Sequence, residues 1–540
     1  MTHIHECQRD QKLAVARIIQ YVLATQEVNL GTDWTIPWWQ KVLPRIGLTV
    51  EEKANIKTEL SQEEAVQLVS SPTDIRIDIL LDLLSMALNV DQDSIKDGKA
   101  PPDIIYDART RQFLYAMTLH MGLEGQELSV VEKSLGQQMY FTLQEKTKEQ
   151  AGDQSSLMNS SAKSSMDQNN SKKKMFRWLA TGAGVVGGGA VIGMCETKEG
   201  GLFAHLLTHF TSFILIIMMI ALTGGLAAPL LAPLIVGLTG ATFFATAGGI
   251  ALVTSLFGLA GGGLAGFKMR RRTQGLNEFG FEQILVDKDI PPIPTLTATI
   301  CVTGFLLDDL DETKASLSLE EINRRQTTDT FCLEYERKTL QDLGYAFRKF
   351  LSNQALRYAG MQVAKQTALH AFFAAVALPA TLLKVADVID DPWQIAVDRS
   401  KKAGIVLADT LEERVQGNRP CNLIGYSCGS LVIWQCLQEL RRRKLHGLIG
   451  HVVLMGAPIP SDDSEVWGNV KSVVSGRFVN CYTADDWVLA YVYRLHSLET
   501  KVGGLAPVPF DGIENLSLDL EGHTSYRDAI PSIMAQIKLE

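Results

Sequence analysis

The pentapeptide Gly425-Tyr426-Ser427-Cys428-Gly429 constrains the fold of this chain more than any other feature of its sequence. It follows an apolar run at 421–424 that is typical of a strand, and it precedes a run at 430–440 with the apolar spacing of a helix. A Gly-x-Ser-x-Gly turn between a strand and a helix predicts a nucleophile elbow, which lifts a serine Oγ clear of a parallel sheet. The glycines fit because a Cβ at either position would clash where the strand and the helix approach. Chance alone supplies roughly 0.2 such pentapeptides in a chain of this length, so the surrounding sequence decides the interpretation.

The last part of the chain, residues 276–540, alternates strand-like and helix-like segments. The expected strands are 297–302, 331–335, 421–424, 451–455, 478–482 and 516–520. Such alternation predicts an α/β fold with a mainly parallel sheet flanked by helices. Because the elbow follows the third expected strand and a long helical region, the order matches the core of an α/β-hydrolase domain.

A serine nucleophile in this fold requires a carboxylate and a histidine, in the chain order Ser, Asp or Glu, His. Serine is a poor nucleophile until a neutral imidazole removes its proton, and a buried carboxylate fixes the tautomer of that imidazole. His523 follows the last expected strand, whereas the other candidate, His496, stands in a helical context. The sequence therefore predicts that Ser427 and His523 form the catalytic pair.

Two neighbouring carboxylates follow the expected strand at 478–482, where the acid of the triad should lie. They are Asp485 and Asp486, and a solvated loop would also accommodate such a pair. Asp486, which directly precedes the apolar run at 487–489, is favoured. On the residues alone, the choice between the two stays open.

Backbone N–H groups beside the elbow are expected to form an oxyanion hole. The first donor would be the N–H of Cys428, directly after the nucleophile. The second would come from the loop after the first expected strand, where Phe305 follows Gly304.

Charge and cysteine content exclude several classes of protein. A net charge of −9 and a pI near 5.7 argue against a nucleic-acid-binding protein, which would carry a basic domain or stripe. The eight cysteines show no C-x-x-C spacing, so they predict buried thiols rather than a disulfide or zinc framework. No metal and no cofactor is therefore expected. The first residues show no signal-peptide pattern, which predicts a cytosolic start.

Residues 1–150 are expected to form a helical N-terminal domain. Apolar residues recur at helical spacing from Ile75 to Ala87 and again from Ala108 to Met121. Residues 151–175 change to Ser, Asn, Gln, Asp and Lys, with almost no large apolar side chain. This composition predicts a disordered polar linker.

The region 176–267 is expected to be embedded in a membrane as two to four helical spans. No Asp, Glu, Lys or Arg occurs from Leu202 to Phe267, and about 20 apolar residues suffice to cross a bilayer. Basic residues flank the region at 172–177 and 268–272, so both ends should face the cytosol and the number of spans should be even. Four spans are favoured over two. The alternative is a glycine-rich helical hairpin buried in a soluble protein or lying within one leaflet.

Short segments spread along most of the chain carry a family resemblance. They are Tyr106-Asp107-Ala108-Arg109-Thr110-Arg111, Ser255-Leu256-Phe257-Gly258, Gly266-Phe267-Lys268-Met269, Ala377-Leu378-Pro379, Asp391-Pro392-Trp393, Gly417-Asn418-Arg419-Pro420, the elbow, Asp486-Trp487 and Gly522-His523. They resemble the transmembrane and coiled-coil domain-containing protein 4 family, a eukaryotic group with an uncharacterised α/β-hydrolase-like domain. The resemblance implies a multi-pass membrane protein and supports Asp486 over Asp485. Relatives often have Leu where this chain has Cys428, and no sustained heptads support a coiled coil here.

Together these features predict a membrane-anchored serine hydrolase that acts on an ester or thioester. Its termini and catalytic domain would lie on the cytosolic side, with the lipid bilayer as partner and a lipid-like ester as the expected substrate. The alternative is a membrane adaptor or trafficking protein that keeps a hydrolase fold without catalysis. A channel or transporter is disfavoured, because intramembrane ionisable groups usually mark transport paths and 202–267 contains no acidic or basic residue besides histidine.

Overall fold

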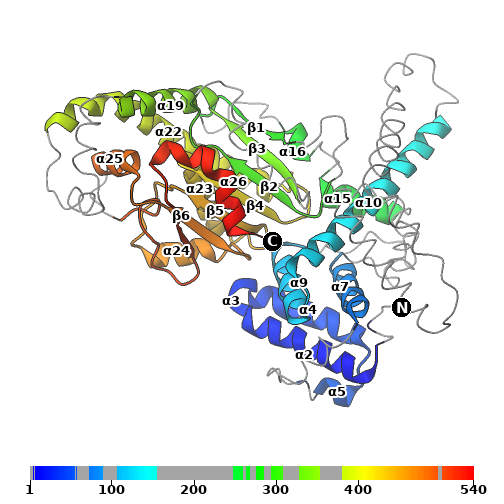
Figure 1. Ribbon diagram of the computed structural model, residues 1–540. Helices are drawn as coiled ribbons and strands as arrows, with labels where there is room; N and C mark the ends of the chain where they lie inside the picture. Colours follow the sequence, from blue (N-terminus) through cyan, green and yellow to red (C-terminus); the bar gives the residue numbers. More distant parts are fainter. Residues whose placement is uncertain are drawn as a thin grey trace, which may run out of the picture.

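The computed structural model shows a helical part and an α/β part, which lie side by side (Figure 1). The residues it describes are 4, 7–54, 56, 72–88, 106–154, 247–258, 263–267, 275–284, 294–307, 328–352, 380–496 and 501–539. The expected linker from residue 155 to 175 and the expected membrane region from 176 to 246 lie outside these ranges.

The first part is built from helices that bury a shared apolar core. They are α2 (Arg9–Thr25), α3 (Glu27–Leu30), α4 (Thr32–Val42), the 3-10 helix η1 (Leu43–Ile46), α5 (Val50–Ala54), α7 (Thr73–Ala87), α9 (Ala108–His120) and α10 (Gly125–Gln154). The segments with helical apolar spacing are α7 and α9. At the start of α9, the Asp107 carboxylate accepts hydrogen bonds from the N–H groups of Arg109 (2.9 Å) and Thr110 (3.0 Å), which caps the helix. α10 continues to Gln154, past the expected boundary at residue 150.

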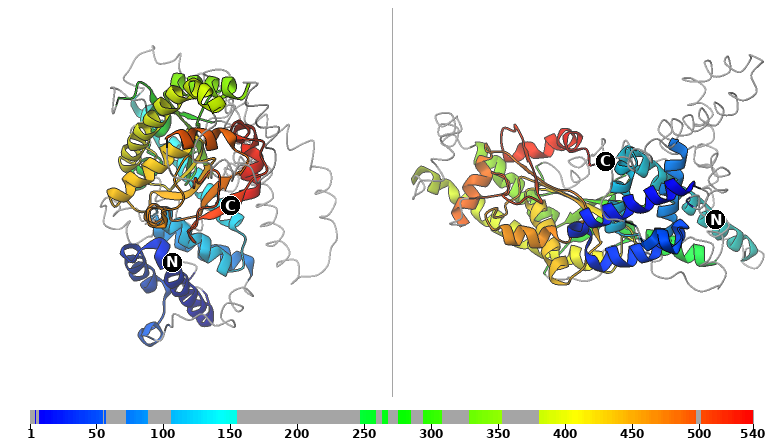
Figure 2. Two further views of the ribbon diagram at one scale, coloured as in Figure 1. Left: turned by 90° about the vertical axis from the view of Figure 1, so that its left-hand side faces the viewer. Right: turned by 90° about the horizontal axis from the view of Figure 1, so that it is seen from below.

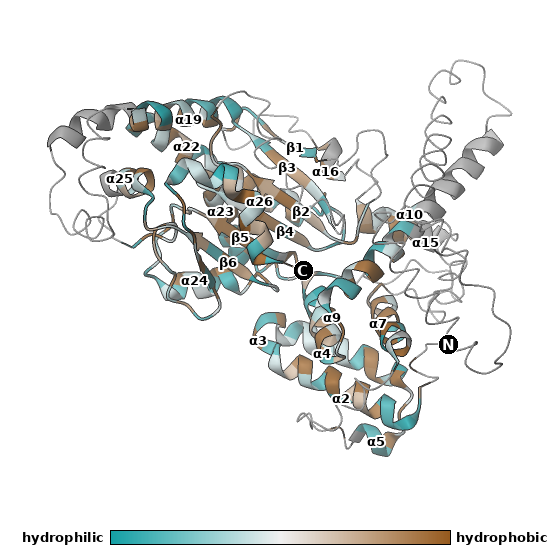
Figure 3. Cartoon of the chain, viewed as in Figure 1, coloured by the Kyte–Doolittle hydropathy of each residue, from teal (hydrophilic) through white to brown (hydrophobic). Residues whose placement is uncertain are grey.

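The second part contains a seven-stranded sheet in the order β1-β3-β2-β4-β5-β6-β7. The strands are β1 (Phe279–Gln283), β2 (Ala298–Val302), β3 (Asp329–Tyr335), β4 (Cys421–Tyr426), β5 (Ile449–Met455), β6 (Phe478–Tyr482) and β7 (Glu514–Ser517). All neighbours pair in parallel except the edge strand β1, which runs antiparallel to β3. The central strands β2, β4 and β5 are buried throughout, as sheets covered on both faces require, and Figure 3 shows their hydrophobic character.

Helices cover both faces of the sheet. They are α19 (Arg337–Ser352), α22 (Ala380–Glu412), α23 (Cys428–Arg442), α24 (Ser464–Lys471), α25 (Trp487–His496), the 3-10 helix η5 (His523–Ser525) and α26 (Tyr526–Ile537). α26 lies on one face and α23 with α24 on the other (Figure 2, right). A mostly parallel sheet between helical layers is the expected α/β fold.

One expected strand is displaced in the structure, and one strand was not expected; the other expected strands lie within two residues of the observed bounds. The last expected strand, 516–520, is β7 and lies earlier, at 514–517, where three of its four residues are exposed. An exposed edge strand has no continuous apolar run in its sequence. The leucines at 518 and 520 therefore shifted the predicted position of this strand toward the C-terminus. β1 was not expected, because its phenylalanines alternate with glycine and glutamate over only five residues.

The described end of the expected membrane region packs against the two cores. It forms two short helices, α15 (Ala247–Phe257) and α16 (Gly263–Gly266). Leu252 and Leu256 of α15 are buried with the N-terminal helices, and Leu264 of α16 is buried in the α/β core. Within the described ranges, no helix combines the length and the apolar character that crossing a bilayer requires.

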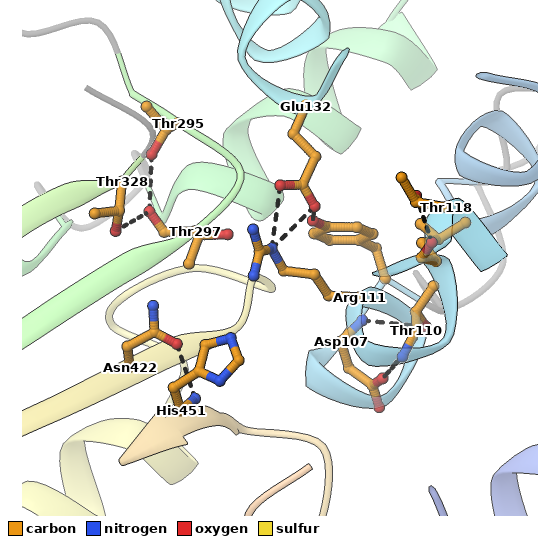
Figure 4. A network of polar contacts seen from close by, with 12 residues as sticks. Asp107, Thr110, Arg111, Thr118, Glu132, Thr295, Thr297, Thr328, Asn422 and His451 are labelled. Atoms are coloured by element: carbon orange, nitrogen blue, oxygen red, sulfur yellow. Dashed lines mark hydrogen bonds and ion pairs between the residues drawn. The ribbon is translucent and has the colours of Figure 1, made fainter. Parts of the chain in front are cut away.

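The helical part contacts the α/β part through the beginning of α9. The N–H of Ala108 donates to the carbonyl of Gly447, just before β5, at 2.8 Å. Behind this contact, the buried Arg111 guanidinium pairs with Glu132 of α10, with Nε 3.1 Å from each carboxylate oxygen (Figure 4). Glu132 also accepts a hydrogen bond from the hydroxyl of Tyr106. The segment 106–111, which entered the family resemblance, therefore joins the two parts.

A buried ion pair ties the strand β3 to the segment that leads into β4. Arg419 and Asp329 have side chains only 4% and 6% exposed, and Arg419 Nη1 contacts an Asp329 carboxylate oxygen. The guanidinium also donates to the carbonyls of Gln416 (Nε, 2.7 Å) and Thr295, and it lies 5.6 Å from the centre of the Phe257 ring of α15. Arg419 thus connects three segments that are far apart in the sequence.

The strand order puts the elbow at the topological switch point of the sheet. β2 pairs with β3 on one side and with β4 on the other, so the chain reverses its direction of winding at β2. In parallel sheets, ligands bind outside the carboxyl ends of the strands at such a switch point. The segment that follows β2 begins at Thr303, and the segment that follows β4 begins at Ser427.

Candidate active site

The elbow itself is a strained turn between β4 and α23. Ser427 has φ 53° and ψ −127°, a left-handed conformation that few residues other than glycine adopt. Strain of this kind, on the order of 1–3 kcal/mol, persists only where neighbouring structure fixes the backbone. Here the Ser427 N–H donates to the Met455 carbonyl at 2.9 Å, and the Ser430 hydroxyl donates to the Gly425 carbonyl at 2.9 Å.

The two glycines of the motif allow the close approach of strand and helix, as the sequence predicted. A Cβ on Gly425 would lie 2.7 Å from the Ile433 side chain. A Cβ on Gly429 would lie 2.2 Å from the carbonyl oxygen of Val302, at the end of β2. Both separations are too short for real carbon contacts, so neither position tolerates a side chain.

The structure brings Ser427, His523 and Asp486 into one hydrogen-bonded chain. Ser427 Oγ lies 2.6 Å from His523 Nε2, and His523 Nδ1 lies 2.6 Å from Asp486 Oδ2. The other carboxylate, Asp485, is exposed at the surface. His496 is the last residue of α25. Of the two neighbouring carboxylates, it is therefore Asp486 that joins Ser427 through His523.

Local structure explains why Asp486 occupies this position. It directly precedes α25, and its Oδ1 accepts a hydrogen bond from the N–H of Leu489 at 2.9 Å. A carboxylate before a helix is stabilised by the free N–H groups and the positive end of the helix dipole. Burial first and the nearby Asp486 carboxylate second raise the pKa of the buried Tyr526 hydroxyl.

The turn that carries His523 also has a backbone requirement. Gly522 has φ 150° and ψ −171°, a region populated almost only by glycine. The ring of His523 then points into the protein, where the whole residue is 1% exposed. The pair Gly522-His523 in the sequence therefore marks a positioned imidazole.

The loop after β2 lies directly against the elbow. A Cβ on Gly304 would lie 2.1 Å from the carbonyl oxygen of Tyr426 and 2.7 Å from the backbone nitrogen of Cys428. Cys428 is the first residue of α23, so its N–H is one of the four that lack an acceptor within the helix. The backbone N–H of Phe305 belongs to the next residue of the same loop, directly after Gly304. Both expected oxyanion donors thus come from segments that touch Ser427.

Replacing Gly304 by Ala is expected to lower the free energy of unfolding by about 1–3 kcal/mol, because overpacking forces the loop and the elbow apart. Chemical denaturation measures the effect. Gly280→Ala is the matched control, because its Cβ would meet only the Phe267 carbonyl at an ordinary 3.5 Å. Equal stability of the two variants would contradict this view of the loop.

Aromatic rings enclose the histidine. The ring centres of Phe305 and Phe347 lie 5.7 Å and 5.3 Å from that of His523. Trp393 of α22 lies behind, 6.3 Å from Phe347. Ser427 itself is only 1% exposed. The sequence did not identify Phe347 as part of the site, because an aromatic residue on the apolar face of a helix is indistinguishable from an ordinary core residue.

None of the described cysteines is joined in a disulfide, and all of them except the half-buried Cys7 are buried. Cys195 lies outside the described residues. In the described part of the chain, no group of three or more His, Cys, Asp or Glu side chains is arranged to hold a metal ion. Beside the nucleophile, burial raises the pKa of the Cys428 thiol to about 12, so this group stays neutral near pH 7.

Iodoacetamide at pH 7.5 is therefore expected to leave the reactivity of Ser427 unchanged. The neutral, buried Cys428 thiol offers no thiolate to the reagent, whereas Cys7 is half-buried and accessible. Fluorophosphonate labelling before and after alkylation provides the measurement. A loss of labelling that Cys428→Ala prevents would contradict the assignment of this thiol as inert.

Comparison with known proteins gives relatives along much of the chain. A rice protein named "Transmembrane and coiled-coil domain-containing protein STS1" is 35% identical over 59% of this chain and 50% of its own length. "Uncharacterized membrane protein F35D11.3" of Caenorhabditis elegans is 31% identical over 79% of this chain and 63% of its own length. A yeast protein named "Probable lipase MIL1" is 31% identical over 56% of this chain and 28% of its own length. No solved structure matches the chain significantly.

These relatives agree with the resemblance seen in the sequence at the level of a family, without supporting the particular group named there. The chain spans less than two thirds of the length of each of the three proteins. The pattern of one family covers residues 212–540, which include the whole sheet and the elbow. The chain therefore belongs to the family described as "Protein of unknown function (DUF726)".

Proposed function

We propose that the protein is a serine hydrolase that cleaves acyl esters or thioesters. Ser427 is the nucleophile, His523 the general base and Asp486 the residue that orients the imidazole. The observation that carries this proposal is the chain of two 2.6 Å contacts from Ser427 Oγ through the imidazole to Asp486. It is supported by the order Ser, Asp, His in the sequence and by the elbow at the switch point of the sheet.

In the proposed reaction, His523 Nε2 takes the proton of Ser427 as Oγ attacks the carbonyl carbon of the ester. The negative oxygen that forms accepts hydrogen bonds from the N–H groups of Cys428 and Phe305. His523 then gives its proton to the departing alcohol or thiol, which leaves an acyl group on Ser427. Water, deprotonated by the same nitrogen, releases the acid and restores the serine. Asp486 keeps the proton on Nδ1 and stabilises the imidazolium throughout.

The proposed enzyme is bound to a membrane. This is supported by the uncharged stretch from 202 to 267 and by the names of the rice and nematode relatives, which call them transmembrane or membrane proteins. Within this region, residues 176–246, which precede α15, would anchor the chain as a multi-pass segment, because α15 and α16 pack against the protein cores. The catalytic domain would lie on the cytosolic side, because basic residues stand on both sides of the region, at 172–177 and 268–272. The yeast relative, named a probable lipase, favours a lipid-like ester as substrate.

A fluorophosphonate probe tests the proposal, because it reacts only with an activated serine. The wild-type chain should be labelled, and Ser427→Ala should not. Labelling should also disappear after heat denaturation, which destroys the triad but leaves every serine in place. If several reactive probes fail on the folded wild-type chain, the protein keeps a hydrolase-like site without catalysis, as the adaptor alternative requires.

A further inference from the structure

A pocket of about 370 Å³ lies between α22 and α23. Its walls also include the segment after β5 and one residue of α25. The apolar residues that line it include Trp393, Val397, Leu431, Trp434, Ile459 and Tyr493. Its volume falls in the range of sites that bind small molecules, typically about 300–1,000 Å³.

The pocket follows one face of each helix. On α22 it contacts residues 393, 397 and 401, spaced four apart, and on α23 it contacts Leu431, residues 434 and 435, and Gln438. The two helices touch at Gly404, where a Cβ would lie 2.5 Å from the Val432 carbonyl oxygen. Ser427 precedes Leu431 by one helical turn, about 6 Å of rise. The pocket therefore begins one turn from the nucleophile and runs along the same helix.

Two aromatic rings connect the wall of this pocket to the imidazole. Trp393 lines the pocket and contacts Phe347, and Phe347 contacts the His523 ring edge to face. Phe347 therefore lies between Trp393 of the pocket wall and the His523 ring. Phe347 lies on α19, whose apolar face packs here while its opposite face is in solvent, where Tyr345 is 66% exposed.

The lining indicates which part of a substrate fits. Indole, leucine, valine, isoleucine and proline side chains surround the space, and the polar side chains are Lys401, Gln435 and Gln438. Lys401 is exposed, and the two glutamines are half-buried. An apolar interior with polar groups toward solvent suits a hydrocarbon chain, and each buried methylene strengthens binding about fourfold.

We propose that this pocket holds the hydrocarbon chain of the acyl group that Ser427 receives, and that Phe347 is the gate between chain and nucleophile. The inference rests on the proposed function and gives it a substrate class, esters of medium-length or longer fatty acids rather than acetate esters. The step itself is unchanged: the ester C–O bond breaks as the Ser427 Oγ–carbon bond forms.

A photoreactive fatty acid tests the pocket without relying on catalysis. The full chain carrying Ser427→Ala, in phosphatidylcholine vesicles, is irradiated with dodecanoic acid that bears a diazirine near its methyl end. Crosslinks are expected on residues 431–438 or 458–460. Val397→Trp, which fills the pocket, should reduce them at least tenfold. Ile395→Trp, two residues away on the same helix but at a position 51% exposed, should leave them unchanged.

Alkyl phosphonates of increasing chain length, applied to the wild-type serine, test the second half of the inference. Octyl and dodecyl probes should label Ser427 at least tenfold faster than an ethyl probe, and Val397→Trp should abolish only this advantage. If the fatty acid crosslinks to the pocket but no phosphonate labels Ser427 of the wild-type chain, the proposed function is contradicted and the hydrocarbon site is supported. The assignment of the pocket would be overturned if Ser427 were labelled at the same rate by short and long probes, if Val397→Trp did not change that rate, and if no crosslinks formed at 431–438 or 458–460. The proposed function would then remain intact.

Discussion

Replacing Asp486 by Asn is expected to lower the rate constant of ester hydrolysis by about 10⁴-fold, the order of loss that such a change causes in serine proteases. An amide at this position no longer enforces the proton on Nδ1 of His523, and it does not stabilise the imidazolium that forms when Ser427 gives up its proton. The fold should survive, because Asn retains the shape of Asp and its oxygen can still accept from the Leu489 N–H. Steady-state hydrolysis of a chromogenic ester, with circular dichroism to check folding, measures the effect.

Asp485→Asn provides the control for this experiment. The two carboxylates are adjacent in the sequence, but Asp485 is exposed and Asp486 is wholly buried. The Asp485 variant should retain the wild-type rate within about twofold, as is usual for exposed substitutions that touch nothing. Equal losses in the two variants would mean that net charge in this loop, and not the contact with His523, supports the reaction.

The second large effect concerns stability. Replacing Arg419 by Ala is expected to reduce the free energy of unfolding by about 3–5 kcal/mol, because it leaves the buried Asp329 carboxylate without its counter-charge. The change also removes the donors to the carbonyls of Gln416 and Thr295. Urea denaturation followed by tryptophan fluorescence provides the measurement.

Arg443→Ala is the matched control for the loss of an arginine. Arg443 pairs with Asp409, Glu412 and Glu439, whose side chains are 39%, 45% and 15% exposed. Its loss should cost less than the loss of Arg419, because Asp409 and Glu412 remain solvated without it, and pairs with exposed partners typically contribute about 0–1 kcal/mol. A cost for Arg419→Ala as small as that for Arg443→Ala would show that the buried pair is not what joins β3 to the start of β4.

The sequence predicted the parts of the site that depend on local chemistry. The glycines of the elbow, Gly522 before His523 and the Asp before an apolar helix each satisfy a backbone requirement within a few residues. Chain order added the rest, since carboxyl ends of parallel strands meet at one edge of a sheet. The choice between Asp485 and Asp486 stayed open on the residues alone, because the two carboxylates differ in burial. Their burial depends on the packing of α25.

Other features depend on contacts between distant segments and left no sequence signal. Phe347 and Trp393 carry the apolar spacing of any core-facing helix, and only the packed structure places them beside His523. The contact of Ala108 with Gly447 joins residues more than 300 positions apart. The edge strands β1 and β7 were missed or displaced because exposed strands lack the continuous apolar run that marks β4 and β5.

The central claim is that Ser427 is acylated by the substrate and then released by water. A pre-steady-state experiment tests this most directly. Rapid mixing of the full chain with a chromogenic octanoate ester should release a burst of chromophore approaching one equivalent per chain. Mass spectrometry of the quenched sample should find the octanoyl group on the peptide that contains Ser427, and Ser427→Ala should show neither. Turnover without an acylated Ser427, or a burst of equal size from Ser427→Ala, would contradict the account.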